Sequence, residues 1–166
     1  MDQLKNFGFV DETTVEVVGI NGKMSEINAA FGLVQLKHMQ HAINSRKKID
    51  EFYRLHLRDV PGIRCLNSSG QISSNYSYFP ILVEPDYPLT RDELYEKLKQ
   101  NHIFSRRYFY PLISEFPMYR DLNSFKSENL SNSIKFSKKV LCLPIYPGIS
   151  SADQMKIISL ISESNY

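Results

Sequence analysis

A long run without proline is the feature that most constrains what this chain can fold into. Between Ser25 and Arg58 there is no proline, and Gly32 is the one glycine of that run. Ser25 is a favourable N-cap, and Glu26 would lie in the first turn, where an acidic side chain complements the helix dipole. We therefore expect a single helix over residues 25–58, roughly 50 Å long.

The apolar residues of this helix fall on two sides. One side carries them at i, i+3, i+4 and i+7 spacing and regains them later: Ile27, Ala30, Phe31, Val34, Ile49 and Phe52. Leu36, Met39 and Ile43 lie nearly opposite, because each residue turns the helix by about 100°. We expect one side to cover a sheet of this chain and the other to pack on another domain or subunit.

Composition excludes several classes of protein. The 166 residues are 42% hydrophobic and 23% charged, as in an ordinary globular domain. A net charge of +2 argues against a dedicated nucleic-acid or membrane-surface protein. There is no apolar stretch of about 18 residues for a membrane span, and the N-terminus does not resemble a signal peptide. With only two cysteines, we expect a reducing, cytoplasmic compartment.

The rest of the chain alternates short strands with helices. Val15–Val18 is a weak candidate strand, and the better ones are 63–66, 76–84, 103–110 and 140–146. Pro80 predicts an edge position or a bulge for the second of these. Helices are expected from a capping box at Thr90 to Asn101, from about 132 to 139, and from Ser150 onwards.

These elements predict an α+β fold, with a small mixed sheet, helices on one face of it and a long N-terminal helix. The chain then divides into an entry segment with a loop (1–24), the long helix (25–58) and a small C-terminal α+β domain (59–166).

Two segments carry candidate binding chemistry. The loop from Gly19 to Glu26 combines free backbone N–H groups, the Asn21 amide, the Lys23 cation and a helix dipole, which suit an anion such as phosphate. A flexible turn with a good cap is the alternative. The second segment, Arg106–Leu112, holds Arg107, Tyr108 and Tyr110 at a strand end, where they can bind a phosphate or a sugar hydroxyl. A solvated strand face is the alternative there.

Other chemical groups are less promising. His38 and His41 lack a third ligand, so no metal site is expected. Cys65 and Cys142 lie in apolar strand contexts and are expected to be inert thiols. The run Arg46–Lys48 is expected to be a solvated face, and nucleic-acid binding through Arg106 and Arg107 is weakly supported at this net charge.

The loop and helix sequences also resemble a known family. Residues 19–27 (GINGKMSEI) and 29–36 (AAFGLVQL) are similar to the signature block of the DegT/DnrJ/StrS aminotransferases, which use pyridoxal phosphate and act on nucleotide-linked keto sugars. The likeness extends over the whole chain; it includes Arg46, Tyr53, 76–81, 107–112, 140–146, Ser151 and Asp153.

This resemblance implies the C-terminal small domain of a fold type I enzyme. In the family, the large cofactor domain and the lysine of the Schiff base come earlier, and residues 1–9 resemble the stretch after that lysine. None of the lysines present lies in that motif. The resemblance therefore implies no catalytic residue in this chain, which alone should not transaminate.

The resemblance also implies binding roles. Asn21 matches an Asn that reaches across a dimer interface to the cofactor phosphate, and Arg107, Tyr108 and Tyr110 match a segment that faces the sugar nucleotide. Ile113–Ser114 stands where many relatives carry a His, so a contact of that His is not expected here.

The implied substrates are an amino donor, Glu, and a dTDP-linked 6-deoxy-keto-hexose for surface polysaccharides; the position of amination stays open. The implied partner is a second copy of the chain or the large domain. The alternative is a non-catalytic module for nucleotide-sugar binding or dimerisation. Asn21 distinguishes the two interpretations, because its side chain can meet a cofactor phosphate only if another chain supplies the large domain.

Overall fold

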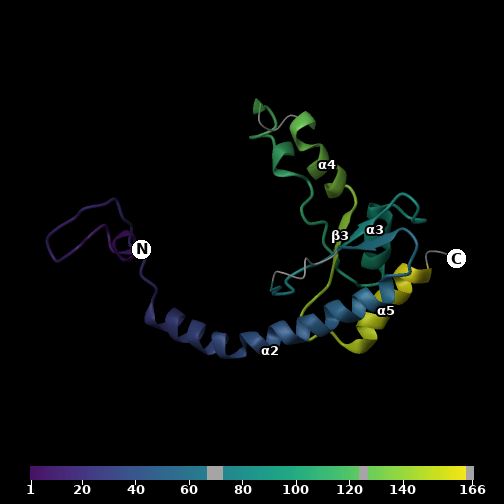
Figure 1. The fold of residues 1–166 in the computed structure, drawn as a ribbon, viewed down its shortest axis with the longest axis horizontal. Helices are drawn as coiled ribbons and strands as arrows, with labels where there is room; N and C mark the ends of the chain where they lie inside the picture. Colours follow the sequence, from purple (N-terminus) through teal and green to yellow (C-terminus); the bar gives the residue numbers. More distant parts are fainter. Residues whose placement is uncertain (67–72, 124–126, 164–166) are drawn as a thin grey trace. The chain divides into compact units, whose positions relative to one another are not determined.

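The computed structural model describes residues 1–66, 73–123 and 127–163 (Figure 1). These form two compact units, Met1–Gln40 and His41–Tyr166. The helix α2 (Glu26–Leu57) contributes its first turns to one unit and the rest to the other. The predicted helix over residues 25–58 is confirmed, and the backbone N–H of Asn28 donates to Ser25 Oγ at 3.3 Å at its start.

The first unit has almost no regular structure before α2. It contains a short helix, α1 (Asp2–Lys5), and two isolated bridges, Asn6–Asn21 and Phe9–Val15. The predicted strand at Val15–Val18 is therefore reduced to one bridge at Val15. The chain reverses just before it, where the Asp11 carboxylate accepts hydrogen bonds from the backbone N–H groups of Thr13 and Thr14.

The second unit is built on a three-stranded sheet. β1 (Ile63–Cys65), β2 (Phe79–Val83) and β3 (Val140–Leu143) lie in that order, and both pairings are antiparallel, where the sequence predicted a mixed sheet. The predicted strand at 103–110 is wrong. Only Arg106 bridges β3, through two backbone hydrogen bonds with Cys142, and the chain turns away at Tyr108.

Pro80 lies in the central strand and in continuous register with β3, so the predicted edge position or bulge is wrong. It is opposite Cys142, whose backbone N–H and C=O both bond to Arg106 on the far side. β1 pairs only as far as Cys65, which is opposite Ile81. No ladder hydrogen bond is therefore required of Pro80 on either side, and the absence of its N–H group costs little.

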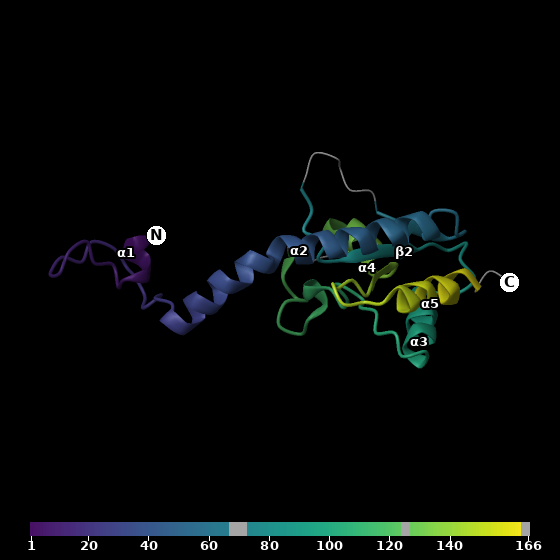
Figure 2. The same cartoon turned by 90° about the horizontal axis from the view of Figure 1, so that it is seen from below.

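Helices cover one face of this sheet, as predicted. The later turns of α2 pack there with α3 (Arg91–Gln100) and α5 (Ser151–Ser162), as Figure 2 shows. The core between them includes Ile49, Tyr53, Leu57, Phe79, Ile81, Val83, Leu94, Leu98, Leu141, Leu143, Ile157 and Ile161. α4 (Ser131–Ser137) is an exception, because its Phe136 lies with Leu82 and Val140 on the opposite face.

Local signals fix the ends of these helices. Thr90 and Glu93 form the predicted capping box, and Ser150 Oγ accepts from the backbone N–H of Asp153. The short helices η1 (Ile113–Glu115) and η3 (Ser127–Leu130) lie in the irregular segment that leads to α4. Tyr53 is fully buried, and its hydroxyl donates to Pro144 O at 3.0 Å, so it ties α2 to the chain after β3.

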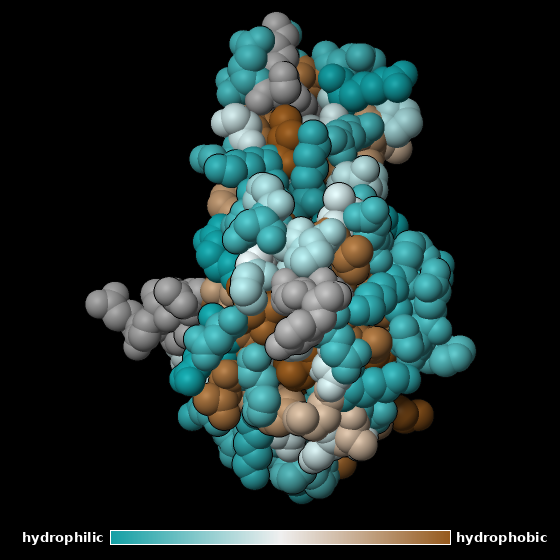
Figure 3. Space-filling view, turned by 90° about the vertical axis from the view of Figure 1, so that its right-hand side faces the viewer, coloured by the Kyte–Doolittle hydropathy of each residue, from teal (hydrophilic) through white to brown (hydrophobic). Residues whose placement is uncertain are grey.

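One face of the surface is drawn in Figure 3. It is largely hydrophilic, with hydrophobic side chains in small groups between hydrophilic ones. Within the described residues, no helix combines the length and the apolar character that a membrane crossing requires.

Glu84 generates a prediction about pH. Its carboxylate accepts from Lys139 Nζ at 2.6 Å and from Arg64 Nε at 3.0 Å, and these hydrogen bonds, Lys139 first, lower the pKa of Glu84. A lowered folded pKa contributes stability above the unfolded value, and this is lost as the pH falls through the folded pKa. We expect Glu84→Gln to lower the free energy of unfolding in urea at about pH 7, and the difference from wild type to shrink as the pH falls below the ordinary carboxyl range.

The matched control for this measurement is Glu96→Gln. Glu96 forms an exposed pair with Lys99 at 3.9 Å, which should contribute little at any pH. A difference between Glu84→Gln and wild type that stays constant across this pH range would contradict the assignment.

The first turns of α2 generate a second prediction. They expose apolar side chains around the helix, Ile27 by 82% and Phe31 by 65%, together with Leu33, Val34, Leu36 and Met39. Such a surface favours self-association. We expect the isolated chain to bind an apolar dye and to associate at high concentration, and Phe31→Lys with Leu36→Lys to suppress both. Leu55→Lys, a lone exposed leucine on the same helix, should not. A monomeric chain that binds no dye would refute this.

Candidate substrate and cofactor site

Asn21 lies in a loop that is held by the N-terminal segment. The neighbouring N–H groups of Ile20 and Gly22 donate to Leu4 O and Lys5 O at 2.8 and 2.9 Å. The Asn21 side chain is exposed and makes no hydrogen bond within the described part of the chain. Its backbone is thus fixed while its amide remains available as a donor.

Gly19 of this loop and Gly8 of the N-terminal segment beside it serve close packing and not flexibility. A Cβ on Gly19 would lie 2.6 Å from the carbonyl carbon of Phe7, too close for any side chain. Gly8, at φ +88°, adopts a backbone conformation that favours glycine and lies against the backbone of Val17. The loop packs against its own chain, and the backbone N–H groups of Ile20 and Gly22, which the sequence predicted to be free, are already engaged there.

Arg107 is already engaged inside the second unit. Its Nη1 donates to Asp92 Oδ1 at 2.8 Å, and its guanidinium lies over the Tyr95 ring at 4.3 Å. Both partners belong to the first turns of α3. The hydrogen bond to Asp92 raises the pKa of Arg107, so this cation is held in place on the helix.

Tyr110 is engaged by a second arginine. Arg91 is only 4% exposed, and its guanidinium lies 4.7 Å from the Tyr110 ring. Its Nη1 donates to the carbonyl oxygens of Ser137 and Val140. Its Nε lies 2.9 Å from Asp92 Oδ1, outside hydrogen-bond geometry, and burial lowers the pKa of Arg91.

Tyr108 belongs to an aromatic cluster with Tyr78 and Phe109. The Tyr108 ring meets Tyr78 edge-on at 5.4 Å and stacks with Phe109 at 5.1 Å. Tyr108 lines two hollows. One, of about 390 Å³, is mostly apolar and is bordered by Phe136 of α4. The other, of about 210 Å³, also holds Arg106 and is therefore the one with a cation.

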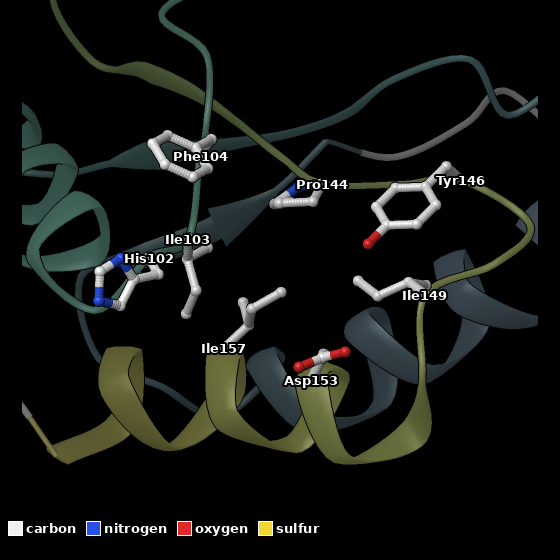
Figure 4. Close-up of a pocket in the computed structure, with 8 residues that line it drawn as sticks. All are labelled: His102, Ile103, Phe104, Pro144, Tyr146, Ile149, Asp153 and Ile157. Atoms are coloured by element: carbon white, nitrogen blue, oxygen red, sulfur yellow. The ribbon is translucent and has the colours of Figure 1, made fainter.

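The hollow at Arg106 adjoins a third one of about 240 Å³. The two share Phe104 and Pro144, and Figure 4 shows the third between the end of β3 and α5. His102, Tyr146 and Asp153 bring an imidazole, a hydroxyl and a carboxylate to an otherwise apolar lining, and Asp153 also accepts from Ser150 Oγ at 2.6 Å. Such polar groups over apolar side chains suit a sugar.

The structure separates the predicted substrate residues. Tyr108 lines a hollow, whereas Arg107 and Tyr110 contact α3 and Arg91. Sequence reasoning missed Asp92 and Tyr95 as partners of Arg107; only the capping box beside Asp92 marked that position, as a helix start. It also predicted Arg46 to be solvated, but its guanidinium donates twice to Asn75 O, at 2.8 and 3.1 Å.

The remaining chemical groups are consistent with structural roles. Cys142 is buried and Cys65 half-buried, both are free thiols, and burial raises the pKa of each. Over the described ranges, no three His, Cys, Asp or Glu side chains gather as metal ligands would.

Comparison with known proteins adds a family and relatives. The model of the DegT/DnrJ/EryC1/StrS aminotransferase family matches residues 1–162. Over 97% of its length, the chain is 53% identical to the dTDP-4-amino-4,6-dideoxy-D-glucose transaminase of Escherichia coli. The matched region makes up 43% of that protein. It is 51% identical, over 98%, to 44% of the Shigella dysenteriae protein of the same name. The chain thus spans less than half the length of these relatives.

A solved structure supports the fold. The crystal structure of DesI in the presence of its TDP-sugar product matches 98% of this chain with 41% of its own, at a TM-score of 0.78 and 27% identity.

The Asn21 loop generates a prediction for this site. We expect Gly19→Ala to push the loop away from Phe7 and so to speed amide hydrogen exchange at Ile20 and Gly22. Gly32→Ala is the matched control, because its added Cβ would meet nothing within 4 Å beyond its chain neighbours and the backbone of its own helix. It should leave the loop unchanged and stabilise α2 by about 0.5–1 kcal/mol. Unchanged exchange in Gly19→Ala would contradict the close packing.

Proposed function

We propose, from the premise that this chain belongs to the DegT/DnrJ/EryC1/StrS aminotransferase family, that it forms the C-terminal part of a sugar-nucleotide transaminase. The enzyme would transfer an amino group to C4 of a dTDP-linked 4-keto-6-deoxy-hexose. The observation that carries this proposal is the 53% identity, over almost the whole chain, to a dTDP-4-amino-4,6-dideoxy-D-glucose transaminase.

Finer parts of the proposal rest on the family resemblance. The amino donor would be Glu, and the amino sugar would serve surface polysaccharides. The catalytic lysine would come from a large domain, because no lysine of this chain lies in the family's Schiff-base motif. Two copies would then be needed for Asn21 to reach a cofactor held by the other.

Pyridoxal phosphate supplies the amino-group carrier and electron sink for such a reaction. Among the described residues, Asn21 has the chemistry to hold it: the amide is exposed, unpartnered and on a fixed backbone. Lys23 lies nearby in sequence, although its Nζ faces the Phe7 ring at 5.6 Å. The residues present therefore fit the phosphate of this cofactor, and one hydrogen bond is the contribution proposed for this chain.

The sugar nucleotide would lie against the second unit. Tyr108 contributes a ring to the hollow at Arg106, and the adjoining hollow offers Tyr146 and Asp153. These side chains would bind and orient the substrate and exclude water around it. No proton transfer is assigned to them.

The alternative, a non-catalytic module, also has an observation in its favour. The exposed apolar turns at the start of α2 suit pairing with another chain whether or not catalysis follows. An activity measurement separates the two.

The test is a chimera in which residues 1–162 of this chain replace the matching part of the Escherichia coli relative. We expect it to bind pyridoxal phosphate and to aminate the dTDP-4-keto-6-deoxy-sugar with Glu, whereas the isolated chain does neither. Asn21→Ala should weaken the affinity for pyridoxal phosphate by about tenfold or more, because a hydrogen bond to a charged group is lost.

Asn28→Ala is the control for this variant. It removes an exposed amide from the start of α2 and should leave the cofactor affinity unchanged. A folded chimera without transaminase activity would favour the binding module, and unchanged cofactor affinity in Asn21→Ala would remove Asn21 from the site.

A further inference from the structure

Two adjacent arginines face different surroundings, although the sequence gives no reason to distinguish them. We propose that Arg106, with Tyr78 and Tyr108, binds the diphosphate of the sugar nucleotide, whereas Arg107 is a positioning residue that holds this segment on α3. This inference rests on the proposed function and deepens it by naming the residue that recognises the diphosphate.

Arg106 has a fixed backbone. Its N–H donates to Cys142 O at 2.9 Å, and the N–H of Cys142 donates to Arg106 O at 2.7 Å. Cys142 belongs to β3, the strand that completes the sheet. A side chain that starts from a sheet is placed more reproducibly than one on a free loop, which is what recognition of a ligand requires.

The Arg106 side chain is free to bind an anion. It is exposed, it lines the hollow of about 210 Å³, and it makes no ion pair or side-chain hydrogen bond across the described ranges of the chain. A guanidinium presents a planar fork of donors that matches two phosphoryl oxygens at once. The unpaired cation and the hollow beside it thus have the chemistry of a diphosphate site.

Arg107 lacks this freedom. Its Nη1 is on the Asp92 carboxylate at 2.8 Å, and its guanidinium lies over Tyr95. An anion that approached Arg107 would also approach Asp92 and be repelled by it. The contact instead holds the chain on α3 at the residue that separates Arg106 from Tyr108, so it orients both.

The aromatic rings favour a nucleotide over the cofactor as the source of the phosphoryl group. Tyr78 is 54% exposed and Phe109 67% exposed, and both contact Tyr108, which lines the same hollow as Arg106. Exposed rings beside a cation offer stacking surfaces for a base next to the site for its phosphates. Pyridoxal phosphate carries a single phosphate one methylene from its pyridine ring, whereas a nucleotide sugar offers two phosphoryl groups to the guanidinium and a more distant base to the rings.

The experiment uses the chimera and two competing ligands, dTDP and thymidine. We expect Arg106→Ala to weaken inhibition by dTDP by about tenfold to a hundredfold and to leave inhibition by thymidine nearly unchanged. The KM for the sugar nucleotide should rise by a similar factor, with little change in kcat and in the affinity for pyridoxal phosphate. Arg106→Lys should recover part of the loss.

Variants of the positioning contact should behave differently. Arg107→Ala and Asp92→Asn are expected to weaken inhibition by dTDP and inhibition by thymidine by the same factor, because the binding of both ligands depends on the placement of the segment. The ratio of the two inhibition constants should therefore stay at its wild-type value, which a direct contact with the diphosphate would not allow.

Three outcomes would overturn the proposal. The first is unchanged inhibition by dTDP in Arg106→Ala. The second is a selective loss of inhibition by dTDP, with inhibition by thymidine retained, in Arg107→Ala. The third is a loss of pyridoxal phosphate affinity in Arg106→Ala with an unchanged KM, which would assign Arg106 to the cofactor. Inactivity of the unaltered chimera would instead overturn the proposed function, and this inference with it.

Discussion

The second unit depends on one constraint, which is that β2 is buried from both sides. Phe79, Ile81 and Val83 face the core beneath α2, α3 and α5, while Leu82 is buried on the opposite face. That opposite face needs its own cover, and the segment with Tyr108, together with Phe136 of α4, supplies it. The candidate substrate residues are therefore placed by the need to cover the sheet, and their hollows lie where that cover is incomplete.

A buried charge then fixes where the covering segment can lie. Arg91 begins α3 and is almost fully buried, so its guanidinium must find acceptors inside the protein. It finds two carbonyl oxygens, those of Ser137 at the end of α4 and Val140 at the start of β3. One side chain thus joins α3, α4 and the sheet, and its ring contact with Tyr110 adds the covering segment.

What the sequence could predict follows from the range of the interactions concerned. The helix over residues 25–58 and the capping box at Thr90 depend on neighbours within a few residues, and both were predicted correctly. The central position of β2 was not predicted, because it depends on where β1 ends and on the hydrogen bonds between the Cys142 backbone and Arg106. The same holds for the candidate site. The exposed amide of Asn21 follows from its position in a loop, whereas the pairing of Arg107 depends on Asp92, which lies in a different element.

The same reasoning explains why a conspicuous arginine need not be the one that binds. A guanidinium paired with a carboxylate has already gained its charge-assisted contact, and an anionic ligand would have to displace that carboxylate or tolerate it nearby. An adjacent guanidinium without a partner can bind an anion without displacing a carboxylate and without repulsion from one. Alternation along an extended backbone sends neighbouring side chains to opposite sides, so one cation of the pair Arg106–Arg107 holds the structure and the other, under the proposal above, would bind the ligand. The order of the two residues, more than the number of positive charges, would then decide where a diphosphate binds.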